Sequence, residues 1–485
     1  MEDKNKKIIQ LLTLSFLLIQ PFFDLVWTYS SISTLIRVII VVFLFTSTIF
    51  IYRDQKILKC FLGYWIIVFL FFILQHLKNS SDQGFVTNFY YSLFEEGLYF
   101  VKMMIPLMTI YVVYKNIVVD KKTINIISRF CLLISLSIII TNILKISYTS
   151  YLDEKIMGNI FDWFNNNSIP YTYLASKGYF YFTNHIVAIL VIFLPIVNIE
   201  KQPLTTISMM LALIMLGNKI STYGSYLVLL TICFVYLFCL FVFKEKIKSK
   251  ARIISYFICL LGLPFIIIYS PARERIITNE GTNLSDSITD YSHQEENSYD
   301  DIIINDNEPL NKIEFILSNH EEKRLNPIFF LYYPYELDQD FWYEILNGPE
   351  ELIINYRYLE KQILSRVVDL NDNPLDFWFG ISYSRNMNIV NLERDFESQI
   401  YSVGFIGLIL FLLPYMLLLL SNLSKVLKGN ISFENSMFLF AGLLLFLIAY
   451  LSGNIINSLS VMIPYAYILG MMTKKISNQR SDNLL

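Results

Sequence analysis

The 485-residue chain has few of the residues on which soluble enzymes rely. Only 16% of its residues are charged, whereas 55% are hydrophobic and 16% aromatic, and the mean hydropathy is +0.49. This composition argues against a soluble enzyme and is typical of a polytopic membrane protein. The net charge of −3 gives no sign of a nucleic-acid partner.

Cysteine and histidine are also scarce. The five cysteines all lie in or beside apolar runs, which predicts neither a disulfide nor a CxxC metal site. The four histidines have no spacing typical of zinc ligands. We therefore expect no cofactor and no metal, although carboxylates alone could still hold a divalent cation. These residues are Cys60, Cys131, Cys233, Cys239 and Cys259, and His76, His185, His293 and His320.

Two further features are missing. The basic N-terminus and the apolar run over 8–23 resemble a signal peptide, but no small-residue cleavage site follows, so we expect a retained first helix. No internal repeat suggests the inverted duplication of many transporters.

Long apolar runs flank one long polar segment. A membrane-spanning helix needs about 20 apolar residues, and the chain offers about 12 such runs. We expect an all-α polytopic membrane protein with transmembrane helices over 1–270 and 399–475, a large loop over 271–398 that carries short helices, and a tail over 476–485. The expected spans are 8–24, 31–52, 58–77, 92–114, 123–145, 181–198, 204–217, 221–243, 253–270, 399–421, 433–452 and 455–473.

Basic residues predict the orientation. They gather in alternate short loops, at 4–7, 53–59, 115–122, 201, 244–252, 425–428 and 474–480, and are sparse in the others. The positive-inside rule then places both termini in the cytoplasm and the large loop outside the cell membrane.

The large loop is acidic, with 26 Asp and Glu against 10 Lys and Arg over 271–399. Its first part, 271–350, contains a Ser/Asn/Asp-rich stretch that we expect to be partly mobile. From about 310 onward, amphipathic stretches predict short helices with aromatic faces. The second part, 351–398, holds most of the candidate functional residues.

Carboxylates precede the span that starts at 399. Glu393, Asp395 and Glu397 could supply a general base or orient an acceptor hydroxyl. They could equally be solvated, or could stabilise the positive end of that helix. Gly404 and Gly407 then form a small-xxx-small pattern that favours close helix packing.

Several outward cations are candidate phosphate ligands. Arg357, Arg366 and Arg385 lie in the loop, and their planar guanidinium groups match phosphate oxygens in pairs. Each could instead form a salt bridge within the acidic loop. Lys219 stands in an otherwise uncharged outward turn after Gly217, where it could help to bind an anion or simply extend to the interface.

Polar residues also occur within the apolar runs. Asn184 and His185 begin one span, where His185 is either a proton carrier or a hydrogen-bonded packing residue. Charges inside spans are costly and usually face a polar cavity. The charges concerned are Arg37, Glu95, Glu96, Lys102 and Arg129.

The order of these motifs resembles that of the O-antigen ligase and Wzy-type polysaccharide polymerase family of bacterial membrane proteins. The resemblance covers most of the chain and is carried by 177–185, 217–223, 355–357, 378–383 and, most strongly, 393–407. Each motif is short, and their order around the large loop is the specific feature.

The resemblance implies a fold like that of membrane glycosyltransferases of type C, and a metal-independent, inverting transfer of glycan. The donor would be an undecaprenyl-diphosphate-linked oligosaccharide, and the acceptor a sugar hydroxyl of a polysaccharide at the outer face of the bacterial membrane. The residues that would bind the diphosphate are Lys219, Arg357, Arg366, Arg385 and Asn184. Glu393, Asp395 or His185 would orient or deprotonate the acceptor. A flippase or other transporter of lipid-linked oligosaccharide, and a non-catalytic envelope assembly protein, remain alternatives.

Overall fold

The hydrophobic runs form helices, because a helix satisfies its own backbone hydrogen bonds where lipid offers none. The structure is a computed structural model that describes residues 2–26, 31–152, 154–164, 169–200, 202–242, 250–276, 308–323, 325–349, 353, 356–390, 392–428 and 431–482. Contacts divide the chain into two compact units. The first comprises Met1–Lys59, Lys102–Ser285 and Leu413–Leu485, and the second comprises Cys60–Val101 and Asp286–Leu412. Each unit is described by itself.

Ten of the twelve expected spans coincide with apolar helices. Among the described residues, seven helices are long and apolar enough to cross a membrane: Ile32–Tyr52, Gln55–Ser81, Leu93–Asn116, Lys121–Ile143, Ile220–Val242, Asp395–Leu427 and Phe433–Leu451. Three shorter apolar helices are Thr183–Val197, Pro203–Met215 and Tyr256–Ile268. The runs at 8–24 and 455–473 are also largely helical, but the total of twelve spans stays a prediction.

The first unit is a helical bundle with a small antiparallel strand pair. Its helices are α1 (Glu2–Ile19), α2 (Phe23–Val26), α3 (Ser31–Tyr52), α6 (Lys121–Ile143), α7 (Tyr171–Leu174), α8 (Thr183–Val197), α9 (Pro203–Met215), α10 (Ser225–Val242), α11 (Lys250–Ile268), α21 (Phe433–Leu451) and α22 (Leu459–Asp482). Short helical turns are η1 (Gln20–Phe22), η3 (Asp162–Phe164) and η4 (Ile220–Gly224), and strand β1 (Tyr148–Thr149) pairs with β2 (Ser176–Gly178).

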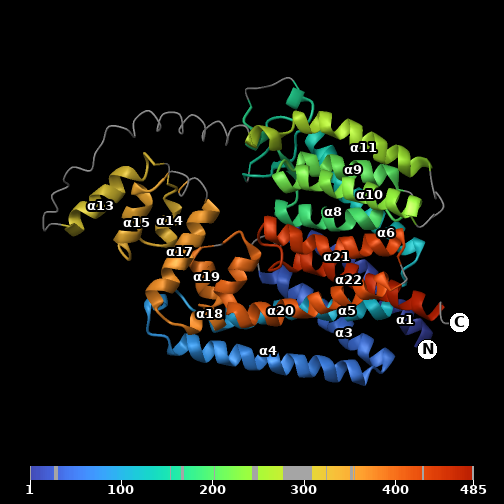
Figure 1. Cartoon of the computed structure of the whole chain (residues 1–485), viewed down its shortest axis with the longest axis horizontal. Coiled ribbons are helices and arrows are strands. Elements are labelled where there is room, and N and C mark those ends of the chain that lie inside the picture. Colours follow the sequence, from blue (N-terminus) through green and yellow to red (C-terminus); the bar gives the residue numbers. More distant parts are fainter. Residues whose placement is uncertain are drawn as a thin grey trace. The chain divides into compact units, whose positions relative to one another are not determined.

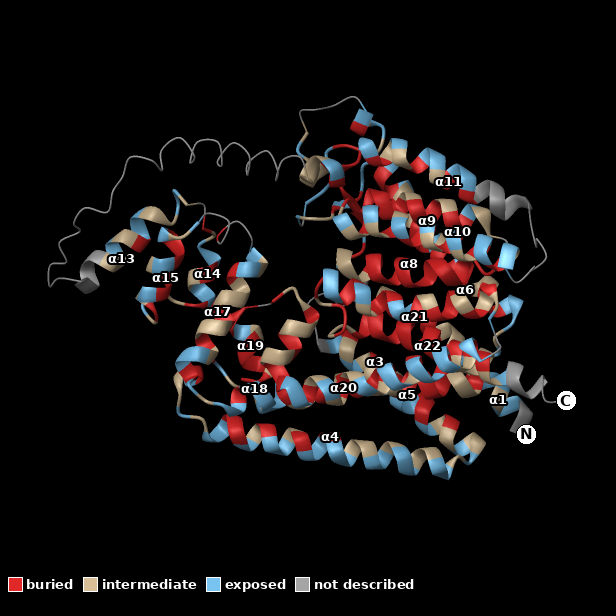
Figure 2. Cartoon of the chain, viewed as in Figure 1, coloured by how far each residue is buried: buried red, intermediate tan, exposed pale blue. Residues whose placement is uncertain are grey.

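Helix α8 forms the centre of this bundle. Every residue from Ile186 to Val197 is buried, and α8 packs against α6, α9, α10, α21 and α22. A helix that is apolar on all sides is stable only when other helices surround it. The burial colours of α8 and α22 show this arrangement (Figure 2).

The second unit carries the loop helices. They are α13 (Glu308–Asn319), α14 (Ile328–Tyr332), α15 (Gln339–Asn347), α17 (Tyr356–Asn371), α18 (Leu375–Phe379) and α19 (Tyr383–Ile389), with η2 (Phe85–Asn88). Parts of three helices also fall in this unit, and their full bounds are α4 (Gln55–Ser81), α5 (Leu93–Asn116) and α20 (Asp395–Leu427). The loop helices α13, α14, α15 and α17 gather together (Figure 1).

Short helices occur between 308 and 389, where the amphipathic stretches predict them, and they enclose an apolar core of their own. Trp342, Tyr333 and Leu359 are fully buried in this core, and the Trp342 indole donates to the Tyr333 carbonyl at 3.0 Å. Helices α13 and α15 pack on each other, as α17 packs on η2 and α19. The Ser/Asn/Asp-rich stretch expected to be mobile, 281–310, lies outside the described residues except for 308–310.

Two glycines let α18 and α20 approach at backbone contact. Gly404 interrupts α20 with φ +66°, and Gly380 ends α18 with φ +71°. A Cβ at Gly404 would lie 2.3 Å from the carbonyl atoms of Trp378. Gln75 of α4 joins the two segments, since its amide donates to the carbonyls of Phe379 and Ser402 at 2.8 Å each. Close packing at Gly404, expected from the small-xxx-small pattern, is therefore present.

Replacing Gly404 by alanine tests this contact. The left-handed backbone and the clash with Trp378 predict that Gly404→Ala destabilises the protein by roughly 3 kcal/mol. Gly63 is the matched control, because it lies in α4 with no atom within 4 Å of an added Cβ, and Gly63→Ala should be neutral or stabilising by about 0.5–1 kcal/mol. Thermal unfolding in detergent, followed by tryptophan fluorescence, compares the two; equal melting temperatures would contradict the packing described.

Candidate functional site

The residues expected to act on substrate fall in both units. Asn184, His185 and Lys219 belong to the first unit, and Arg357, Arg366, Arg385, Glu393 and Asp395 belong to the second. The two groups are described separately.

A small pocket lies at the start of α8 in the first unit. Pro21 lies in a tighter helical turn, η1, that follows α1, and the chain then brings Asp24 to the pocket. Helix α8 contributes His185, and the start of α22 contributes Ser460. The remaining lining is mainly apolar and aromatic: Pro21, Phe180, Tyr181, Phe182, Ile186 and Ile189. The pocket thus joins a carboxylate, an imidazole and a hydroxyl to an aromatic wall.

Both ring nitrogens of His185 have partners. Nε2 lies 3.0 Å from the carbonyl oxygen of Asn454, and Nδ1 lies 2.9 Å from the Ser460 hydroxyl. A carbonyl oxygen only accepts, so Nε2 carries a proton, and in the neutral ring Nδ1 accepts from the hydroxyl. The Nε2–H group is therefore directed at Asn454, and Ser460 is the hydroxyl with which Nδ1 could exchange a proton. Asn184, its neighbour, is half-buried.

Asp24 is the carboxylate of the pocket, and a buried arginine orients it. Arg37 is 2% exposed and donates from Nη1 and Nη2 to the two Asp24 oxygens at 3.0 Å each. Gln20 accepts from Arg37 Nε at 3.0 Å, and its own amide donates to the Ser460 carbonyl at 3.1 Å. A bidentate pair of this kind fixes the carboxylate plane. The sequence interpretation named Arg37 and missed Asp24, although an acid beside Pro21 in an apolar run was a usable signal.

Lys219 lies in a tightly built turn. Gly217 has φ +72°, and a Cβ there would lie 2.6 Å from the Ala175 side chain. The Gly217 carbonyl accepts from the Tyr151 hydroxyl at 2.7 Å, and Asn218 Oδ1 accepts from Ser221 N at 2.6 Å. Lys219 itself is exposed. The turn thus presents its lysine to the surroundings.

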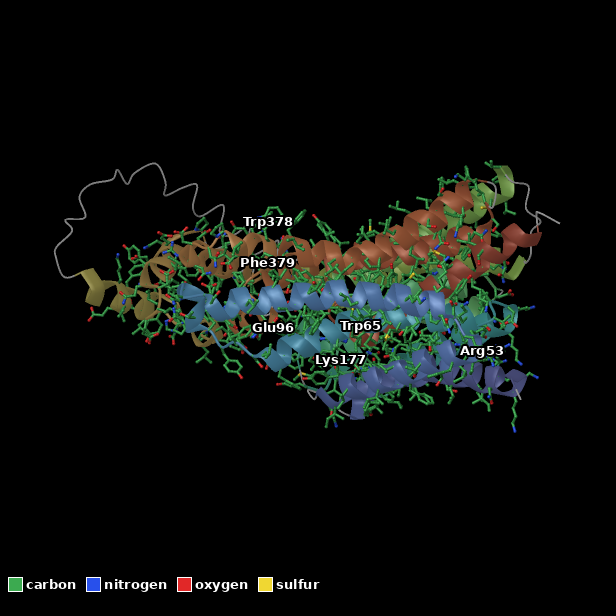
Figure 3. All side chains as sticks on the ribbon, turned by 90° about the horizontal axis from the view of Figure 1, so that it is seen from below. Arg53, Trp65, Glu96, Lys177, Trp378 and Phe379 are labelled. Atoms are coloured by element: carbon green, nitrogen blue, oxygen red, sulfur yellow. The ribbon has the colours of Figure 1, made fainter. Side chains whose placement is uncertain are left out.

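A second cation is tied to that turn. The Arg275 guanidinium lies 5.1 Å above the Tyr151 ring and donates to its hydroxyl at 3.3 Å. Lys177 (labelled in Figure 3) contacts a different tyrosine: it is buried, and its ammonium group lies 5.6 Å from the centre of the Tyr181 ring. Arg275 is therefore a cation that the structure associates with the Lys219 turn.

In the second unit, α17 and the start of α20 are joined by a ladder of polar contacts. Its rungs are Arg357–Glu393 at 2.7 Å, Lys361–Glu397 at 3.4 Å and Ser365–Tyr401 at 2.8 Å. From each rung to the next, both segments advance by four residues, about the length of one helical turn. The predicted arginine and carboxylate groups are therefore neighbours, and each neutralises the other in part.

Arg357 and Glu393 form the most accessible rung. Their side chains are 39% and 43% exposed, so the pair contributes only about 0.2–1 kcal/mol to stability. A negatively charged ligand could therefore displace Glu393 from Arg357 at small cost. Asp395 differs, because it is only 1% exposed.

Glu360 adjoins this rung and was not among the sequence candidates. Its Oε2 accepts from the backbone N–H of Glu393 at 3.4 Å. Burial and the nearby Glu393 charge raise the pKa of Glu360 to about 7, although the Glu393 N–H and Arg357 act in the opposite direction. Two neighbouring carboxylates in different electrostatic environments form a possible acid–base pair. An isolated Glu in a helix gives no signal of such a shift.

Arg366 serves the core of the loop. It donates to Asp338 from Nε at 2.7 Å and from Nη2 at 3.3 Å, while the Tyr333 hydroxyl donates to the same carboxylate at 2.8 Å. Burial raises the pKa of Asp338, but the hydrogen bonds from Arg366, Phe341 N and Tyr333 outweigh it, so the net shift is downward. Arg366 is thus engaged with Asp338.

Arg385 is enclosed in a buried polar cluster. It is 4% exposed and donates to the Asn79 carbonyl at 3.3 Å, and its guanidinium lies 5.3 Å from the Tyr91 ring. Burial lowers the pKa of Arg385. Lys78, which directly precedes Asn79 in α4, pairs with Asp376 of α18, and its ammonium nitrogen lies 3.4 Å from the carboxylate of Asp82. A ligand could reach Arg385 only if this cluster opened.

Glu96 caps α19 from α5. Its carboxylate accepts from Ser384 N at 2.6 Å and from Tyr383 N at 3.2 Å, where the positive end of a helix favours negative charge. The expected polar cleft at Glu96 is therefore filled by the chain itself. Figure 3 labels its position.

Comparison with known proteins gives one result for nearly the whole chain. Residues 5–479 match the model of a family described as "O-antigen ligase like membrane protein". No curated protein matches the chain. No group of three or more His, Cys, Asp or Glu residues suited to a metal ion occurs among the residues that the structure describes.

The raised pKa of Glu360 predicts a pH-dependent stability. The folded protein holds this proton more tightly than the unfolded chain, so the contribution is complete below the ordinary pKa of 4.5 and is lost as the pH rises through about 7. Glu360→Gln keeps the neutral form, so it should stabilise the protein above about pH 7 by on the order of 1 kcal/mol, allowing for solvent screening. Unfolding measured from pH 5 to 8 tests this. The exposed Glu344→Gln on α15 is the control, and an equal effect of both substitutions would contradict the assignment.

Proposed function

The chain belongs to the family of O-antigen ligase-like membrane proteins, and from this premise we propose that it transfers glycan from an undecaprenyl-diphosphate-linked donor to a sugar hydroxyl. The family indicates a multi-pass membrane protein that acts as a cell-surface polysaccharide ligase or polymerase on lipid-linked substrates. To this the proposal adds that the donor lipid is undecaprenyl diphosphate, that transfer takes place at the outer face of the membrane, and that it inverts the anomeric carbon without a metal ion.

The proposed step exchanges one bond for another. The acceptor oxygen attacks the anomeric carbon from the face opposite the diphosphate, the bond from that carbon to the diphosphate oxygen breaks, and the hydroxyl proton passes to a base. Undecaprenyl diphosphate leaves with both electrons of the broken bond. Since diphosphate is already a good leaving group, catalysis rests mainly on neutralising its charge and orienting the acceptor.

The observation that carries the proposal is the pocket around Asp24. A carboxylate held in one plane by Arg37 suits the task of orienting a hydroxyl and accepting its proton. The Ser460 hydroxyl, bonded to His185, offers a second polar contact beside it. The aromatic wall of Phe180, Tyr181 and Phe182 provides flat apolar surface against which the carbon face of a sugar ring can pack.

The accessible cations are the better candidates for the diphosphate. Lys219 is exposed, and Arg357 pairs with Glu393 where both side chains are accessible, at 39% and 43% exposed. Glu393, released when Arg357 binds a phosphate, would become available as a base beside Glu360. We propose that Arg366, Arg385 and Asp395 stabilise the loop and do not contact the substrate. Arg366 is bonded to Asp338, and Arg385 and Asp395 are buried. His185 and Asn184 would support the Asp24 pocket.

Asp24 is tested by substitution. Asp24→Asn preserves shape but removes the base, so we expect turnover to fall by about 100-fold or more with little change in KM for the donor. The assay uses purified protein in nanodiscs with an undecaprenyl-diphosphate oligosaccharide and follows the products. Asp54→Asn is the control, because Asp54 pairs with Lys115 at 2.8 Å in the same unit outside the pocket.

The products also separate the functional classes. Lengthened glycan indicates a polymerase, transfer to a different acceptor indicates a ligase, and movement of donor across the bilayer without a new bond indicates a flippase. Normal turnover by a stable Asp24→Asn protein would remove Asp24 from the mechanism, and no glycan transfer by the wild type would count against the proposed function itself.

Arg357 and Arg366 should respond differently to alanine. Arg357→Ala removes an exposed pair, so stability should change by less than about 1 kcal/mol while KM for the donor rises. Arg366→Ala leaves Asp338, 6% exposed, without its main partner, and should cost roughly 2 kcal/mol of stability. Melting temperatures and donor titrations of both variants test whether Arg357 binds the donor and whether Arg366 stabilises the fold. An unaltered KM for Arg357→Ala, or an unaltered melting temperature for Arg366→Ala, would refute the respective assignment.

A further inference from the structure

Helix α18 buries its acidic residue and exposes its large apolar residues. Asp376 is 4% exposed and accepts from Asn371 Nδ2 at 2.7 Å. Leu375, Phe377 and Trp378 are 46%, 56% and 45% exposed. Water favours the reverse arrangement. The outer face of α18 therefore calls for an apolar partner.

The inner side of α18 is firmly held, so the exposure of its aromatic face is a property of the fold. Asp376 pairs with Lys78 of α4, and the carbonyl of Phe379 accepts from Gln75 at 2.8 Å. Immediately after α18, Ile381 N donates to the Tyr401 carbonyl at 2.8 Å. The contact of Trp378 with Gly404 completes this attachment to α20.

The aromatic face continues the surface of a membrane-spanning helix. Phe377 stacks on Phe405 of α20 with ring centroids 5.7 Å apart, and Trp378 lies 6.2 Å from the same ring. Beyond Phe405, Ile406 and Ile409 are 38% and 45% exposed. In a helix apolar enough to cross a membrane, such residues face lipid. The patch on α18 is thus continuous with a lipid-facing surface.

Trp378 also lies at the level where α20 changes from polar to apolar. The first turns of α20 contain several polar residues, and none occurs from Val403 to Leu413. These polar residues are Asp395, Glu397, Ser398, Gln399 and Ser402. Trp378 contacts α20 at Gly404, at this transition, and its side chain projects away from the ribbon in Figure 3. Tryptophan is enriched at such a level, the boundary between head groups and acyl chains.

We propose that α18 is an interfacial anchor whose partner is the lipid bilayer. Leu375, Phe377 and Trp378 insert at the boundary between head groups and acyl chains, and the buried Asp376–Lys78 pair transmits that position to α4. Because α18 joins α17 to α19, the anchor holds the Arg357–Glu393 rung at a set height above the membrane. This inference does not depend on the proposed reaction.

Brominated lipids test the proposal on the full-length protein. Bromine quenches tryptophan fluorescence on close approach, so the difference in emission between wild type and Trp378→Phe in nanodiscs isolates the contribution of Trp378. We expect phosphatidylcholine brominated near the head group to quench most of that contribution, and phosphatidylcholine brominated deep in the chain to quench less. Trp342 is the control, because it is fully buried in the loop core. The difference in emission between the wild type and Trp342→Phe isolates Trp342, and neither brominated lipid should change it.

Aqueous iodide provides the opposing measurement. Trp378 should be shielded from iodide in nanodiscs. If iodide quenches Trp378 while brominated lipid does not, the face lies in water; if neither quenches it, protein covers the face. Either outcome overturns the proposal. Should Trp378→Phe fail to fold, a nitroxide attached to Phe377→Cys, after replacement of exposed Cys60 by serine, reports the same distinction by its accessibility to oxygen and to an aqueous nickel chelate.

Discussion

A charge inside a membrane protein must find a partner within the chain, and this constraint organises both units. In the first, Arg37 meets Asp24 through two hydrogen bonds and Gln20 through others. In the second, Lys78 meets Asp376 beside Asp82 and Asn371. An unpaired ion costs several kcal/mol in such surroundings. Each pair therefore determines which helix ends come together, and the pocket of Asp24 and the position of α18 follow from these pairings.

The same charges divide into those that hold buried groups of the fold and those whose side chains are accessible to solvent. Arg366 is 32% exposed but holds the buried carboxylate of Asp338, and Arg385 is itself buried beside Asn79 and Tyr91. Withdrawal of either arginine would leave buried polar groups without partners. Arg357 pairs with Glu393 in partial contact with solvent, and Lys219 is exposed. Exchange of one partner for another is inexpensive only for the second group. Among the eight site residues predicted from the sequence, this difference favours Arg357 and Lys219 over Arg366 and Arg385 as ligands of a substrate.

Sequence analysis could predict the helices of the spans and of the loop, because their signals are local: apolar length for the spans and 3.6-residue periodicity for α13, α15 and α17. It could also predict that arginine and carboxylate groups would meet, as Arg357 and Glu393 do. Sequence analysis did not identify Asp24 or Glu360 as site residues. Asp24 is oriented by Arg37 of α3, and Glu360 has its environment set by Glu393, and neither contact leaves a local signal in the sequence. Asp395 looked equivalent to Glu393 in sequence, yet Asp395, the first residue of α20, is 1% exposed, whereas the side chain of Glu393, just before α20, is 43% exposed.

By itself, the sequence determined the class of protein, its largely helical fold and its family, since hydropathy over about 20 residues and the order of short motifs are properties of the chain alone. Tertiary structure alone decided which charges are neutralised, which nitrogen of His185 carries the proton, and why Gly404 must lack a side chain. It also decided that α18 turns Asp376 inward and Trp378 outward. The physical reason is that burial and electrostatic environment arise from neighbours distant in sequence, and no local pattern records them.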